Sequence, residues 1–256
     1  SMAFPRSTRT AYAVVAVSMI SVGSIVASGS LRLLSGGGPA RSRRAIVTQL
    51  GPGIALSTCI NSLTSPRTSY SFENRLPVKL EPYPKTPGPQ PRDLGLRSDG
   101  SLKGCDFVKP NCFSTSANPD DIEGELYKSY LVQPFKYSKG RNEAFQDILN
   151  VLKSYEVGHD NIDGGGFKIV KQDEKNGYVY VQYESLKKGY IDDFEVSVNP
   201  DGTVGLRTAS RLGFLDLRVN AKRFNYIASK LGDLPGWSAP PVTSKTHPQY
   251  FQMNRM

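Results

Sequence analysis

The sequence predicts an α+β domain in which an antiparallel four-stranded meander is flanked by two helices. Three observations support this fold class. Four consecutive runs alternate apolar and polar residues with a period of two, amphipathic helical patterns precede and follow them, and proline is concentrated outside this region. We therefore expect one folded domain between a Pro-rich extended N-terminal arm and an irregular C-terminal tail.

The helix before the meander is predicted over residues 142–155. Its apolar residues recur at i, i+3, i+4 and i+7, which places them on one face. They are Phe145, Ile148, Leu149 and Leu152. Asn118-Pro119-Asp120-Asp121 indicates a further, short helix start, because a capping side chain, a proline and two acids stand in the favoured order.

The four predicted strands follow each other closely, as an antiparallel meander requires. Their ranges are Phe167–Asp173, Tyr178–Ser185, Ile191–Val198 and Thr203–Ala209. Lys175-Asn176-Gly177 and Asn199-Pro200-Asp201-Gly202 are turn sequences, and they separate the first strand from the second and the third from the fourth. The aromatic residues crowding these strands favour packing within the sheet, although an apolar surface for a hydrophobic ligand is an alternative.

The second helix is predicted over residues 221–231, with Gly232 as its C-terminal stop. Phe224, Ile227, Ala228 and Leu231 form its apolar stripe. Two helices on a four-stranded meander predict a sandwich in which one face of the sheet is covered.

Residues 1–69 have the composition of a targeting leader. The first 72 residues contain seven Lys or Arg and no acid. Residues 1–28 resemble a signal peptide, with a retained anchor as the alternative, and residues 29–69 contain a transit-like stretch and the twin-arginine-like Ser42-Arg43-Arg44. This order predicts delivery to the thylakoid lumen of a plastid, with the stroma, the mitochondrion and secretion as alternatives.

The leader also carries most of the positive charge. The formal net charge is +9, but the chain after residue 72 contains 25 basic and 23 acidic residues. A nearly neutral body does not favour nucleic acid as a partner. The Pro-rich arm, residues 70–104, and the tail, residues 232–256, are expected to bind a protein partner, a thylakoid membrane complex, at the membrane periphery.

Three cysteines occur, and Cys59 lies in the leader. The spacing of Cys105 and Cys112 suits a small disulfide loop in an oxidising compartment. Free thiols remain an alternative, and so does metal binding or catalysis with His159. The spacing is not that of a zinc site, and no metal or cofactor is expected.

The segment from Arg207 to Arg223 has the densest charge pattern of the chain. Asn220 is placed to cap the following helix, and Asp216 is the nearest acid for Arg211 and Arg223. One interpretation is an internal Arg–Asp–Arg network that fastens the helix to the sheet. The other is an anion pocket made by both arginines and the helix N-terminus.

This segment resembles the domain-of-unknown-function 1499 family, and the resemblance covers residues 105–231. It rests on four ordered motifs: Pro110-Asn111-Cys112, Gln133-Pro134-Phe135-Lys136-Tyr137, Asp192-Asp193-Phe194-Glu195, and Arg207 to Arg223. Thr208, Leu215, Arg218 and Ala221 depart from the family pattern. The resemblance implies a fold and a lineage but no reaction.

Asp192, Asp193 and Glu195 place acids on both faces of one predicted strand, where one of them can pair with Arg207 or Arg211 across the sheet. No catalytic set accompanies these acids. We therefore expect a non-catalytic accessory protein of the thylakoid, associated with a photosynthetic membrane complex such as a photosystem. The alternatives are a carrier of a small anionic or hydrophobic ligand, using Arg211, Arg223 and the aromatic sheet, and a thiol-dependent enzyme.

Overall fold

The computed structural model describes residues 72–79, 85–106, 108–117 and 129–255. The expectations for the leader, residues 1–69, and for the helix start at residues 118–121 therefore lie outside the described residues. Within the described ranges, none of the helices combines the length and the apolarity that a membrane crossing requires.

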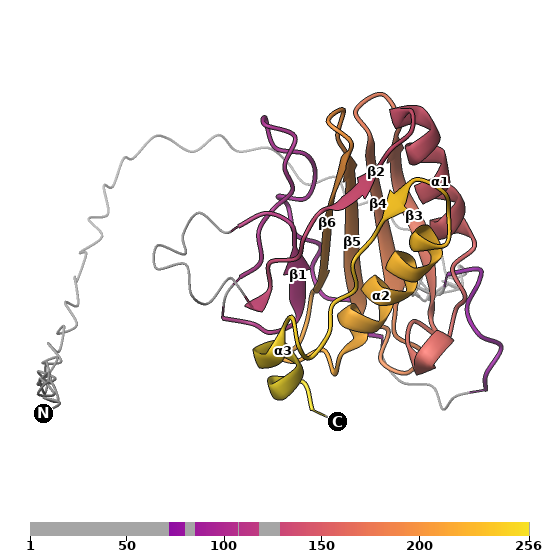
Figure 1. Ribbon diagram of the computed structural model, residues 1–256. Coiled ribbons are helices and arrows are strands. Elements are labelled where there is room, and N and C mark those ends of the chain that lie inside the picture. The colour runs from indigo at the N-terminus through magenta and orange to yellow at the C-terminus, as the bar shows by residue number, and fades with distance from the viewer. Residues whose placement is uncertain (1–71, 80–84, 107, 118–128, 256) are drawn as a thin grey trace, which may run out of the picture. The chain divides into compact units, whose positions relative to one another are not determined.

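The domain is built on one antiparallel sheet (Figure 1). The described residues form seven strands, in the order β3-β4-β5-β6-β2-β7, with β1 also paired to β6. The strands are β1 (Cys112–Ser114), β2 (Phe135–Tyr137), β3 (Gly166–Asp173), β4 (Tyr178–Glu184), β5 (Ile191–Val198), β6 (Thr203–Ser210) and β7 (Trp237–Ser238). The α+β class and the meander β3 to β6 are confirmed.

The prediction of four strands was wrong, because β1, β2 and β7 extend the sheet beyond β6. Each of these strands has only two or three residues, which is too short to display an alternating pattern. β1 and β2 both pair with β6, β1 along Arg207 to Ala209 and β2 along Thr203 and Val204. The sheet thus gains strands from the sequence before the predicted meander, β1 and β2, and from the sequence after it, β7.

Alternation along the meander separates two faces of the sheet. One face carries Val179 and Val181 of β4 and Phe194 and Val196 of β5, and these side chains belong to the main core. The opposite face carries Tyr178, Tyr180, Asp193, Glu195 and Arg207, all of which are buried. A sheet buried on both faces needs a cover on each side.

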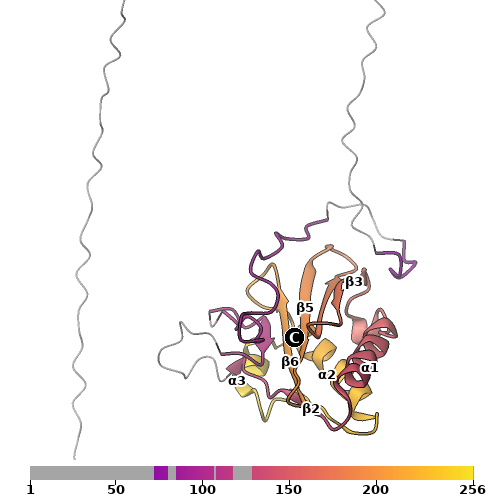
Figure 2. The same cartoon turned by 90° about the horizontal axis from the view of Figure 1, so that it is seen from above.

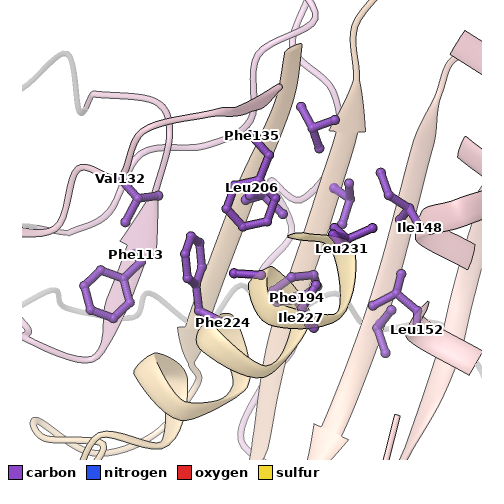
Figure 3. Packing of buried hydrophobic residues seen from close by; sticks show 14 of the residues in the cluster. Phe113, Val132, Phe135, Ile148, Leu152, Phe194, Leu206, Phe224, Ile227 and Leu231 are labelled. Atoms are coloured by element: carbon purple, nitrogen blue, oxygen red, sulfur yellow. The ribbon is translucent and has the colours of Figure 1, made fainter. Parts of the chain in front are cut away.

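Helices α1 (Arg141–Lys153) and α2 (Val219–Gly232) cover the first face. Figure 2 shows them together on one side of the sheet. The apolar stripe of α2 packs between the sheet and α1, with Phe224 towards Phe135 and Leu231 towards Ile148 (Figure 3). Phe224 and Phe135 have ring centroids 5.2 Å apart.

The second face is covered by the Pro-rich segment, which the sequence predicts as an extended arm. Leu102, 1% exposed, packs with Tyr178 and Tyr180. The amide of Gly95 donates to Glu195 Oε1 at 2.7 Å, and Ser197 Oγ donates to the carbonyl of Gly100 at 3.0 Å. Within its described part, residues 85–104 therefore form a layer of the domain, and the expectation that only one face is covered was wrong.

The tail also packs against the domain, in contrast to the irregular segment expected from residue 232 onwards. It contains β7 and helix α3 (Pro248–Met253), which lies beside β1 (Figure 1). Tyr250 is fully buried, with its ring centroid 4.4 Å from that of Phe113. A third helix in the described residues thus closes one end of the core.

Candidate functional site

A cleft of about 640 Å³ opens at the end of the sheet where β3, β5 and α2 begin. Three loops form its walls: residues 158–164 before β3, residues 185–190 between β4 and β5, and residues 210–219 between β6 and α2. The apolar lining residues are Leu76, Ile162, Leu186, Leu212, Leu215, Leu217 and Val219. The acids in the lining are Asp163, Asp192 and Asp216. This volume and mostly apolar wall are typical of sites for small ligands.

Unusual backbone conformations line the same cleft. Asn161, Asp163 and Leu217 have φ angles of 61°, 54° and 53°. Asparagine and aspartate tolerate this left-handed region, whereas leucine does so at a cost. The amides of Asp216 and Leu217 both donate to Asn254 Oδ1, at 3.0 and 3.1 Å, and these bonds hold the Leu217 backbone in place.

The wall around Gly213 is tied to the first family motif. Asn111 Nδ2 donates to the carbonyl of Gly213 at 2.8 Å, and Asn254 Nδ2 donates to the carbonyl of Pro110 at 2.7 Å. Residues 110 and 111 thus position the loop that carries Leu215 and Leu217. The Pro-Asn-Cys motif has a structural role in shaping the cleft.

Asp216 forms the start of α2, and the expected cap by Asn220 was wrong. The helix begins after Arg218, and Asp216 Oδ2 accepts the amide hydrogen of Asn220 at 2.9 Å. Tyr250 Oη also donates to the carboxylate, at 2.8 Å. Burial raises the pKa of Asp216, and repulsion from Asp192 raises it further, while the hydrogen bonds oppose both effects.

Arg223 is fully buried beneath the cleft, and all five of its N–H groups donate. Arg223 Nε donates to Asp163 Oδ2 at 2.8 Å. Arg223 Nη2 donates to Asp163 Oδ1 at 2.5 Å and to Asp192 Oδ2 at 2.8 Å. Nη1 donates to Thr208 and Asn220. No N–H group of Arg223 is left for an external anion, so the anion pocket, the alternative interpretation of this segment, does not form at this residue.

Arg211 lies on the opposite side of the sheet from Arg223. Its Nη2 lies 2.7 Å from Asp193 Oδ1 and 2.9 Å from Tyr180 Oη. Asp216 forms no ion pair among the described residues, so the expected grouping of Arg211 and Arg223 around Asp216 was wrong. The two arginines belong to separate networks because Asp192 and Asp193 point to opposite faces of β5.

A further network lies beside Arg211 on the outer face. Arg207 Nη1 lies 3.3 Å from Glu195 Oε2, across β5 and β6, and Tyr178 Oη donates to Glu195 Oε1 at 2.7 Å. The cross-strand pairing that the sequence predicts for these acids is thus present. The segment around Gly95 covers this pair, which makes it part of the interior.

Asp192 differs from the other acids of the cleft in having an oxygen without a partner. Its Oδ2 accepts from Arg223, while Oδ1 has no hydrogen-bond partner among the described residues. The residue is 8% exposed and lines the cleft. Asp163 and Asp216, in contrast, have donors at both oxygens.

The cysteines and His159 do not form a common site. Cys105 and Cys112 are joined in a disulfide with an S–S distance of 2.09 Å, so neither is a thiol in this structure. His159 packs against Tyr226 in a tilted arrangement, with ring centroids 4.7 Å apart. The described residues contain no group of three His, Cys, Asp or Glu arranged to hold a metal ion.

Sequence reasoning missed Asp163, Tyr155 and Asn254. Tyr155 Oη donates to Asp163 Oδ2 at 2.6 Å, which supports the partner of Arg223. Asp163 is 60 positions from Arg223, and only its place before the glycines 164 to 166 marks it in the sequence. Asn254 lies in the segment predicted to be irregular, so its fully buried side chain had no signal there.

Comparison with protein families gives one match: residues 104–231 match the model of a protein of unknown function, DUF1499. Comparisons with curated proteins and with solved structures found no significant match. The matched range includes the disulfide, the meander, α1 and all of α2 except its last residue, Gly232. It ends before α3 and Asn254, although Tyr250 of α3 and Asn254 just after it both contact the loop that forms one wall of the cleft.

Proposed function

The chain belongs to the DUF1499 family of proteins of unknown function, and from this premise we propose that it is a non-catalytic accessory protein of the thylakoid. It resides on the lumenal side, at the membrane periphery. Its partner is a photosynthetic membrane complex such as a photosystem. The domain supplies a binding surface and no reacting groups.

The state of the charged residues supports a non-catalytic role. Arg207, Arg211 and Arg223 are each paired with an acid, and their side chains are at most 7% exposed. A general acid or base has to reach a substrate in a cleft. These groups stabilise the interior, so the densest charge pattern of the sequence is not offered to a substrate.

The exposed apolar loop between β6 and α2 is the observation that carries the proposal of a partner. Phe214 is 51% exposed, and Leu215 and Leu217 beside it are 38% and 53% exposed. Neighbouring exposed apolar side chains are typical of an interaction site. Aromatic residues such as Phe214 are also enriched in the energetically dominant part of interfaces.

The docking surface thus differs from the one expected from composition. Residues 85–104 and the tail from residue 232 pack on their own domain, so the proposal does not rely on them as straps. The loop at residues 212–217 takes their place in the proposal. The thylakoid location is supported by the composition of residues 1–69, in which a signal-like, a transit-like and a twin-arginine-like segment follow one another.

Fractionation of thylakoids followed by native gel electrophoresis tests the proposal. The wild-type protein is expected in the membrane fraction, migrating with a large complex, and protected from added protease until the thylakoids are opened. Phe214→Glu is expected to release it as a monomer, because a carboxylate in an apolar interface loses its hydration.

Val170→Glu is the matched control. Val170 is also apolar and 42% exposed, but it lies on β3 outside the loop, so this variant should still migrate with the complex. A wild-type protein found as a free monomer in the stroma contradicts the proposal. Equal migration of Phe214→Glu and wild type contradicts the role of the loop.

A further inference from the structure

We propose that the cleft binds a small amphiphile whose protonated amine contacts Asp192 and whose apolar body lies against Leu212, Leu215 and Leu217. The proposal concerns a low-molecular-weight ligand and does not depend on docking to a membrane complex. It also differs from the anionic ligand that the arginines suggest in the sequence.

The buried charges of the cleft favour a cation. Asp163, Asp192 and Asp216 line it and are buried, and Arg223 is the buried arginine that faces two of these three acids. Lys187 and Lys188 also line the cleft, but both are exposed, so water and salt screen their charges. Among the buried charged groups, the cleft therefore has more carboxylates than Arg223 can neutralise. An anionic ligand would meet carboxylates that repel it, whereas an ammonium group supplies the missing positive charge.

The position of the amine follows from Asp192, the acid of the cleft lining that has an oxygen without a partner among the described residues. Asp192 is mostly buried, and Arg223 holds its Oδ2, which fixes the orientation of the carboxylate. Its Oδ1 has no partner among the described residues, although the side chain lines the cleft. A buried, oriented and half-paired carboxylate is an acceptor prepared for a charged donor.

The apolar body of the ligand follows from the walls. Leucine, isoleucine and valine side chains from all three loops surround the cleft, and the exposed fractions of Leu215 and Leu217 show that its mouth is open. A volume of about 640 Å³ is sufficient for an alkyl chain of about eight carbons. Burial of such a chain gains about 0.8 kcal/mol per methylene group.

Titration of the ¹⁵N-labelled protein with octylamine, octanol and octanoate at neutral pH tests the proposal. Octylamine is expected to bind saturably, one molecule per protein, and to shift the amide signals of residues 162–164 and 212–219. Octanol should bind at least about tenfold more weakly, because it lacks the charge-assisted contact, and octanoate should not saturate.

Two variants separate the head group from the apolar body. Asp192→Asn removes the charge at the same shape and should weaken octylamine binding at least about tenfold. Leu215→Lys keeps the interior intact, because Leu215 is partly exposed, and should weaken octylamine binding by a similar factor. Asp160→Asn is the control: this acid is exposed and outside the cleft lining, so affinity should stay within about twofold of wild type.

Several results would overturn the proposal. The wild-type protein would contradict it by binding octylamine and octanol equally, by preferring octanoate, or by not binding octylamine saturably. The variants would contradict it if both Asp192→Asn and Leu215→Lys bound octylamine like wild type. If Asp192→Asn does not fold, Leu215→Lys alone decides. Phe214→Glu should bind octylamine like wild type, so failure of membrane docking and failure of ligand binding are distinguishable.

Discussion

At the residue scale, the buried guanidinium of Arg223 holds together parts of the chain that are far apart in sequence. It joins α2 to Asp163 before β3 and to Asp192 on β5. Its own charge and both acids are out of water, so each depends on the others. Coulombic attraction from both acids keeps the pKa of Arg223 well above its usual value even though burial opposes this.

Replacing Arg223 by methionine should therefore be costly. Arg223→Met keeps most of the volume but leaves two buried carboxylates without their cation, and we expect the free energy of unfolding to fall by about 3–5 kcal/mol. Urea unfolding at neutral pH measures the loss. Lys222→Ala is the control, since Lys222 is next in sequence and its Nζ donates to the carbonyl of Asp160 at the surface, and its cost should stay within about 0.5 kcal/mol. A loss of under 1 kcal/mol for Arg223→Met would show that the network is dispensable.

His247 gives the stability of the domain a pH dependence. Its Nε2 lies 3.1 Å from the carbonyl of Leu131 and its Nδ1 2.8 Å from Thr246 Oγ1. A carbonyl only accepts, so Nε2 carries the hydrogen and Nδ1 accepts from the hydroxyl in the neutral ring. Burial lowers the pKa of His247 below 6.5.

Because the folded-state pKa of His247 is the lower one, the unfolded chain binds the proton first as pH falls. The contribution of His247 to stability is thus present above pH 6.5 and is lost on acidification towards the folded-state pKa. Urea unfolding of wild type and His247→Gln at pH about 7.5 and 5.5 measures it. Wild type should lose more stability than the variant between these two values. An equal loss would show that His247 does not couple to folding.

The sequence predicts the placement of charged residues on the strands better than their partners. Alternation correctly places Asp192 and Asp193 on opposite faces of one strand. It cannot indicate that Arg223 reaches Asp192 while Arg211 reaches Asp193, because this depends on which helix and which loop cover each face. Asp163 was missed because it lies in a loop, and a loop residue has no periodic pattern that would mark it in the sequence.

At the element scale, long amphipathic patterns predict the structure well. Helix α2 extends two residues before and one residue after its predicted range, and β5 has the predicted bounds. β1, β2 and β7 were missed because short strands are defined by their pairing with β6 and β2. Such pairing is a property of the folded chain and leaves almost no local pattern.

The Pro-rich segment is the element whose role composition misjudges most. Proline does exclude a helix there, as predicted, but an extended chain can still cover a sheet. It also brings charges with it: Lys85 Nζ lies 2.5 Å from Glu184 Oε1, whose side chain is fully buried. Burial raises the pKa of Glu184, although the nearby Lys85 opposes this shift.

Leu102→Ala tests whether this segment is part of the core. Leu102 is buried against Tyr178 and Tyr180, so its truncation should lower the free energy of unfolding by about 2–5 kcal/mol. Val78→Ala, at a position that is about half exposed, is the control and should cost within about 0.5 kcal/mol. Chemical denaturation of both variants compares them. A free linker predicts the same small effect for the two.

At the scale of the whole molecule, the domain is larger than its family-matched part. The match ends at residue 231, yet the tail supplies Tyr250 and Asn254. Tyr250 donates to the carboxylate of Asp216, and Asn254 accepts from the amide of Asp216 and donates to the carbonyl of Pro110. The tail thereby closes the core and fixes one wall of the cleft. Composition alone gave no sign of this, because few buried residues among many prolines and polar residues are sufficient to anchor a segment.

Removal of residues 233–256 tests how far the domain depends on its tail. The deletion uncovers Phe113 and removes the fully buried Tyr250, and loss of one large buried aromatic already costs about 3–5 kcal/mol. Since domains have a net stability of about 5–15 kcal/mol, the shortened chain should lose its cooperative thermal transition or melt far below the intact protein. A chain that ends after Asn254 is the control, because it keeps Tyr250 and Asn254, and it should melt like wild type. Circular dichroism and limited proteolysis compare the three. An unchanged melting temperature without residues 233–256 would mean that the tail is a detachable strap, as composition suggests.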